Sequence, residues 1–253
     1  MTRSLSQIRE DSRNALAGNY LLFFFVLVIT GVMTWTANQI VSVLALPFGG
    51  AGFFVLVLVN FILDFLVMIL AKMLQAGQFF LSLNIARYNR VSVSDLFLAF
   101  RYDAPKAFQL SAVLALIETV CLMPMTLSLS NLAYAGAFSL DAGRHIPAWM
   151  ILILAVCGIA GMIFLETVIA FPFSQALFLY IDHQEMSASE CLRSSRSWMR
   201  GHIVEFFRLH LSLAGYFALC VISMGVGLIW VLPYLDVIKA NYYRNLTGTY
   251  KPY

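Results

Sequence analysis

Three acidic residues lie deep inside long apolar stretches of this chain of 253 residues: Asp64, Glu118 and Asp236. Each lies about 9 to 11 residues into its stretch, near the middle of a bilayer at about 1.5 Å of rise per residue. A charged side chain at that depth costs roughly 2.5 to 3.5 kcal/mol on insertion scales. The three acids therefore predict a candidate intramembrane polar site for a proton, a cation or a cationic substrate. The alternative is that each acid is protonated or hydrogen-bonded to a neighbouring helix as a packing contact.

Two further ionisable residues, Lys72 and Glu166, predict an ion pair nearer one end of their apolar stretches. Asp236 and Lys239 stand at i and i+3, where they could also neutralise each other. Glu166 and His210 are the one acid and base combination that a membrane-embedded enzyme could use. The chain has no nucleophile elbow, phosphate-binding glycine loop or metal-ligand spacing. We therefore expect no catalytic residues, no cofactor and no metal.

The elements that position these residues are apolar helices, since 61% of the chain is hydrophobic and 11% is charged. A soluble domain carries about 25% charged residues. Several stretches exceed the roughly 20 residues that cross a bilayer. The composition predicts an all-α polytopic transmembrane bundle that forms a single transmembrane domain over residues 1–253. Its expected spans, about six, cover residues 19–44, 53–76, 107–129, 148–171, 206–224 and 227–245.

Basic residues set the expected orientation, because positive charge is retained on the cytoplasmic side. Nearly all Lys and Arg residues lie in alternate segments, and Arg144 lies on the other side. Both termini are therefore expected in the cytoplasm, with the chain in the cell membrane. Cytoplasmic arginines attract anionic headgroups at about 1 kcal/mol each, so membrane lipids are the expected partners. A protein partner or a second copy is also possible, whereas no basic soluble module predicts nucleic-acid binding.

An internal repeat relates two loops at an offset of 95 residues, since residues 91–97 match residues 186–192. Both segments read apolar-Ser-x-Ser-acid before two further residues. The repeat units cover about 53–129 and 148–224 in the same orientation, with flanking spans at 19–44 and 227–245. Some transporters are built from parallel repeats, but duplication also produces repeats in proteins that transport nothing.

Each of these loops contains a capping-box pattern, in which a serine is followed three residues later by an acid. The pattern predicts a short amphipathic cytoplasmic helix in each loop. At the same offset Gly77 matches Pro172, and both residues are expected to break a helix. The two capping pairs are Ser92 with Asp95 and Ser187 with Glu190.

Four segments carry a family resemblance: NALAGNY at residues 14–20, SECLRSSRSWMRGH at 189–202, GVGLIWVLPY at 225–234 and ANYY at 240–243. Together they resemble a bacterial integral membrane family known as domain of unknown function 975 (DUF 975). The resemblance covers nearly the whole chain, and its C-terminal third is the most specific part. It implies a polytopic helical membrane protein, and the family supplies no activity or catalytic residues.

Three classes of function follow from these observations. The first is a non-enzymatic membrane scaffold, or a protein that interacts with lipid or a partner through its cytoplasmic helices. Such a protein would have a dry, well-packed bundle. The second is a small transporter or permease, whose midplane carboxylates would line a water-accessible cavity. The third, a membrane-embedded enzyme, ranks last.

Overall fold

The computed structural model describes residues 4–50, 53–142 and 147–248, and this part of the chain contains helices and no strand. The predicted all-α fold class is therefore confirmed. The α-helices are α1 (Leu5–Leu16), α2 (Tyr20–Ala45), α3 (Phe53–Ala86), α4 (Leu98–Arg101), α5 (Ala104–Ala142), α6 (Ala148–Leu165), α7 (Ala176–Asp182), α8 (Ala188–Met199), α9 (Ile203–Leu211), α10 (Ala214–Ile222) and α11 (Leu228–Leu246). The shorter turns are η1 (Leu46–Gly50), η2 (Val93–Phe97), η3 (Glu166–Ala170) and η4 (Phe171–Phe173).

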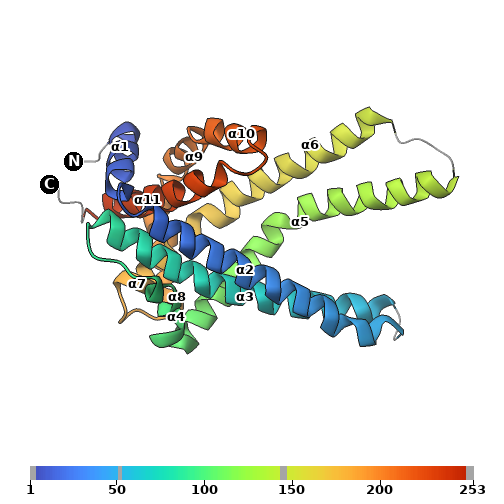
Figure 1. Ribbon diagram of the computed structural model, residues 1–253, viewed down its shortest axis with the longest axis horizontal. Coiled ribbons are helices and arrows are strands. Elements are labelled where there is room, and N and C mark those ends of the chain that lie inside the picture. Colours follow the sequence, from blue (N-terminus) through green and yellow to red (C-terminus); the bar gives the residue numbers. More distant parts are fainter. Residues whose placement is uncertain (1–3, 51–52, 143–146, 249–253) are drawn as a thin grey trace.

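Two long helical hairpins dominate the molecule, one formed by α2 and α3 and the other by α5 and α6 (Figure 1). They diverge from a common base, while both termini, α1, α4, α7 and α8 lie at the base end. Four helical stretches are long and apolar enough to cross a membrane: Tyr20–Phe48, Leu58–Ala86, Ala104–Leu129 and Trp149–Asp182. These stretches overlap the first four predicted spans.

The C-terminal quarter differs from the predicted spans 206–224 and 227–245, neither of which is among these four stretches. An unbroken helix over 206–224 is wrong, because α9 and α10 have nine residues each and are separated by a turn at residues 212–213. Helix α11 carries Asp236, Lys239 and Arg244 and packs on α1, α2 and α3. Most apolar residues in the second half of α11 are buried in the protein core, whereas α10 and the turn after it expose several apolar side chains.

That core lies at the base of the hairpins and contains residues of α1, α8, α11 and the adjoining ends of α3, α5 and α7. Phe178 lies near its centre and is fully buried. Its ring stacks on Phe79 with centroids 4.6 Å apart and on Tyr243 with centroids 5.3 Å apart. In contrast, few residues are buried in the apolar part of the four long helical stretches, between 6% and 22% in each. The long helices expose apolar surface of the kind that lipid covers.

The two predicted helix breaks have different outcomes. Helix α3 runs continuously through Gly77, so the break expected there is wrong. The glycine instead permits close packing of η2, since a Cβ at Gly77 would lie 1.8 Å from the carbonyl oxygen of Leu96. The break at Pro172 is confirmed, because α6 is followed by the π-helical turn η3, the 3₁₀ turn η4 and then α7.

Both predicted capping boxes are confirmed, and each starts a helical segment that packs on the elements just before it. In the first loop η2 packs on α3. In the second, Ser195 of α8 donates a hydrogen bond to the Pro172 carbonyl at 2.9 Å. Arg87 and Asp182, 95 residues apart, form an ion pair at 2.8 Å. The internal repeat itself stays a prediction.

Helices α5 and α6 approach closely where two glycines of α6 face Pro124 and Ser128 of α5. A Cβ at Gly158 would lie 2.6 Å from the Ser128 hydroxyl, and one at Gly161 would lie 2.9 Å from the Pro124 ring. Small residues allow this contact between helices in a membrane. The spacing of these glycines, three residues rather than four, does not match the helix-dimer motif, so the sequence pattern alone gives no sign of the contact.

Candidate functional site

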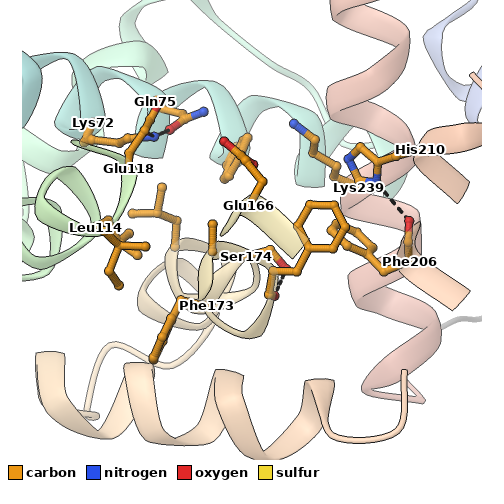
Figure 2. Close-up of a pocket in the computed structure, with 15 residues that line it drawn as sticks. Lys72, Gln75, Leu114, Glu118, Glu166, Phe173, Ser174, Phe206, His210 and Lys239 are labelled. Carbon is orange, nitrogen blue, oxygen red and sulfur yellow. Dashed lines mark hydrogen bonds and ion pairs between the residues drawn. The ribbon is translucent and has the colours of Figure 1, made fainter. Parts of the chain in front are cut away.

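An open cavity of about 250 Å³ lies where the two hairpins meet α9 and α11 (Figure 2). Its charged lining residues come from four elements: Lys72 of α3, Glu118 of α5, Glu166 of η3 and Lys239 of α11. His210 of α9 also lines it. The fold thus brings together ionisable residues that lie far apart in the sequence.

Local helix geometry positions these side chains. Lys72 and Glu118 face each other because α3 and α5 pack together along part of their length. Glu166 begins the π-helical turn η3, directly before the break at Pro172. Single π turns are common at functional sites because the extra residue redirects the side chains around it. In Figure 2, Lys72, Gln75 and Glu118 lie on one side of Glu166, and His210 and Phe206 lie on the other.

Lys72 forms an ion pair with Glu118, rather than with Glu166 as the sequence predicted. The Lys72 ammonium also donates a hydrogen bond to Gln75 Oε1 at 2.9 Å. Glu166 lines the same cavity, so the predicted partners share a site without forming that ion pair. The repeat offset placed Lys72 and Glu166 at similar heights, but the helix packing brings Glu118 closer to Lys72.

The three acids predicted near the midplane do not converge. Glu118 lines the cavity, whereas Asp64 is exposed on α3 and Asp236 is not a lining residue. The Asp236 carboxylate lies 3.7 Å from Lys239 Nζ, and its side chain is 14% exposed. The i and i+3 neutralisation weighed from the sequence is therefore the arrangement that α11 adopts. Counting residues along a helix predicts depth but not the direction in which a side chain points.

His210 lies in α9, outside the four apolar stretches. Its Nδ1 donates a hydrogen bond to the Phe206 carbonyl oxygen at 2.9 Å. Burial lowers the pKa of His210 to about 4, so the ring is uncharged at neutral pH. Both ammonium groups of the cavity are engaged in ion pairs, Lys72 with Glu118 and Lys239 with Asp236 outside the lining. Three of the four charged lining residues are therefore engaged in ion pairs within the protein, as expected for structural contacts.

Sequence reasoning missed two polar residues of this cavity, Gln75 and Ser174. Gln75 follows Lys72 by three residues, a spacing at which side chains on a helix meet, and this was an available signal. Ser174 gave no comparable signal, since its position depends on the break at Pro172. Among the described residues, no group of three or more His, Cys, Asp or Glu side chains could hold a metal ion.

The Lys72 and Glu118 pair leads to a stability prediction. We expect Lys72→Met to lower the free energy of unfolding by about 1–3 kcal/mol, because it leaves a half-buried carboxylate without its cation. The double variant Lys72→Met with Glu118→Leu should recover most of this loss, since replacing both partners of an ion pair by apolar residues is often neutral. Thermal unfolding of the purified protein in detergent measures both. A double variant less stable than the single one would contradict the ion pair.

The helical hairpins, their exposed apolar surface and an open polar cavity at their base are the features of a helical membrane protein. The chain belongs to the family described as protein of unknown function (DUF975), whose model matches residues 1–250. The resemblance stated from the sequence is thereby confirmed. No curated protein and no solved structure matches the chain.

Proposed function

We propose that this chain is a non-enzymatic membrane protein that serves as a platform for lipid headgroups and for a partner protein or a second copy. One observation carries the proposal. The buried core lies in the helices at the base, whereas at most 22% of the residues in the apolar part of each long helical stretch are buried. The base is thus the well-packed part of the molecule. The two hairpins act as its anchors in the bilayer.

The proposed orientation places this base in the cytoplasm, with the chain in the cell membrane. Four spans, like six, are an even number, so both termini lie on one side in either case. The base also carries exposed arginines at positions 90, 101, 193, 196, 200 and 208, as expected for a cytoplasmic face. Arg144, the basic residue expected on the opposite side, lies outside the described residues.

Helix α8 supports a role in lipid or partner contact. One face of this helix packs inward through Cys191, Ser195 and Met199, which are spaced four residues apart and buried. Arg193 and Arg196 are exposed. A helix with a buried face and free cations can rest on an anionic membrane surface or present its charges to a partner.

The ion pairs around the cavity favour this platform over a transporter, since Lys72 is paired with Glu118 and Lys239 with Asp236. A small transporter is the second candidate, because the cavity is open and Glu166 lies in a π turn beside it. Alternating access would require the cavity to open to each side of the membrane in turn. A platform for lipid or a partner does not require the cavity to open to both sides.

Labelling with a membrane-impermeant maleimide distinguishes the two functions. The probe position is Ser174→Cys, which lines the cavity, in a background whose four native cysteines are replaced by alanine. Ser197→Cys on exposed α8 reports the cytoplasmic face in inverted vesicles. Gly50→Cys reports the opposite face in intact cells, since a Cβ there meets no atom within 4 Å.

The platform predicts that Ser174→Cys reacts only from the side that labels Ser197→Cys, or from neither side. Reaction from both sides would overturn the platform and support the transporter. Labelling of the two control positions, each from its own side only, shows that the vesicles are sealed and that the proposed orientation is right.

A further inference from the structure

A second open groove of about 490 Å³ lies between α1, the start of α2, α10 and α11. It is separate from the charged cavity, and the two share no lining residue. Two arginines of α1 and four aromatic side chains give the groove its character. These residues are Arg9, Arg13, Tyr20, Tyr216, Trp230 and Tyr234.

The cationic end of the groove is formed by Arg9 and Arg13, which stand one helical turn apart on the same face of α1. Within the described ranges, neither guanidinium group has a hydrogen-bond or ion-pair partner in the protein. Glu10 also lines the groove, which leaves one net positive charge there. The planar guanidinium fork matches the oxygens of a phosphate group.

Helix α11 holds this end of the groove in shape. The hydroxyl of Tyr234 donates a hydrogen bond to the Arg9 backbone carbonyl at 3.2 Å. The rings of Tyr234 and Tyr216 meet edge to face, with centroids 6.0 Å apart. Because these contacts join α1, α10 and α11, they form a wall beside the arginines that does not depend on a ligand.

The other end of the groove is apolar and leads toward the hydrocarbon. Trp230 is 57% exposed, Ile222 at the end of α10 is 79% exposed, and Met224 in the turn that follows is 94% exposed. Exposed apolar patches mark sites of interaction with a membrane or with another protein. Tyr20 begins the first apolar helix, so the groove lies at the depth where that helix enters the membrane. Tyrosine and tryptophan prefer this interface.

The geometry points to a site for an anionic phospholipid: Arg9 and Arg13 bind its phosphate, and an acyl chain lies along Trp230. The order of cationic, aromatic and apolar surface along the groove matches the order of groups along a phospholipid. This inference requires only that α2 crosses a membrane. It does not depend on the proposed platform.

Tryptophan quenching tests the site in the full-length protein in detergent. The probe is phosphatidylglycerol with brominated acyl chains. Quenching of the other three tryptophans, measured in Trp230→Phe, is subtracted from the quenching in the wild type to give that of Trp230. We expect Arg9→Gln with Arg13→Gln to weaken apparent binding about tenfold or more, because two charge-assisted contacts are lost. The matched control, Arg90→Gln with Arg101→Gln, two exposed arginines that do not line the groove, removes the same charge and should change binding less than about twofold.

Equal weakening in both arginine pairs would overturn the site, since it would show only general attraction to an anionic lipid. Unchanged binding in the α1 pair would overturn it as well. Arg9→Lys with Arg13→Lys should retain part of the affinity, because the charge remains and the fork is lost. Brominated phosphatidylcholine separates headgroup charge from chain binding. Full recovery of the Trp230 signal when inorganic phosphate is added would indicate a free-phosphate site instead. Melting temperatures near that of wild type show that the variants fold.

Discussion

Gly77→Ala is expected to lower the free energy of unfolding by about 3 kcal/mol or more, although alanine is the better helix former. Helix propensity alone would stabilise α3 by about 1 kcal/mol. The added Cβ, however, would lie 1.8 Å from the Leu96 carbonyl oxygen and within 3 Å of two further backbone atoms of that residue. Backbone cannot rotate away as a side chain does, so η2 must move off α3, and overpacking of this kind typically costs 1–3 kcal/mol or more.

Gly31→Ala in α2 is the matched control, because a Cβ there meets no atom within 4 Å. It should leave stability unchanged or raise it by up to about 1 kcal/mol. Thermal unfolding in detergent, followed by the loss of helical circular dichroism, measures both variants. Hydrogen exchange should also rise in η2 of Gly77→Ala. A Gly77→Ala protein as stable as Gly31→Ala would mean that η2 does not pack on α3 as described.

Phe178→Ala is expected to lower the free energy of unfolding by about 3–5 kcal/mol. The Phe178 ring is fully buried in the core at the base and stacks on both Phe79 and Tyr243. Its removal leaves a cavity between α3, α7 and α11 that neighbouring helices fill only in part. Stacked aromatic pairs contribute a further 0.5–1.5 kcal/mol or so beyond the buried area.

Phe164→Ala is the matched control on the same apolar stretch, since Phe164 is 65% exposed. Its side chain faces the surroundings of the helix, so we expect a loss below about 1 kcal/mol. Phe178→Leu should lie between the two because it keeps most of the volume. The same unfolding measurement applies, with gel filtration to show that each variant remains monodisperse. Equal losses for Phe178→Ala and Phe164→Ala would contradict a core at the base.

Features that depend on residues a few positions apart were predicted correctly from the sequence. The two capping boxes depend on residues three positions apart, and both are formed. The break at Pro172 follows from a missing backbone N–H and a ring that crowds the preceding turn. The N-terminal helix α1 was missed, although the capping box of Ser4 with Gln7 was visible in the sequence.

Signals that depend on packing were misread. Gly77 suggested a break, but its role depends on Leu96, 19 residues later in the chain, whose backbone packs against it. Residues 206–224 suggested a span, but the chain divides them between α9 and α10. Hydropathy measures how apolar a segment is. It does not distinguish an apolar segment that faces lipid from one that faces the core.

Composition and run length were thus enough to predict a helical membrane protein and the positions of its long helices, because lipid requires apolar helices of a minimum length. The partner of Lys72, the exposure of Asp64 and the groove beside Arg9 could not be read from the chain. Each depends on how a helix is rotated about its axis and which helix lies beside it. Many small packing contacts between distant residues set these two quantities, and no local sequence pattern records them.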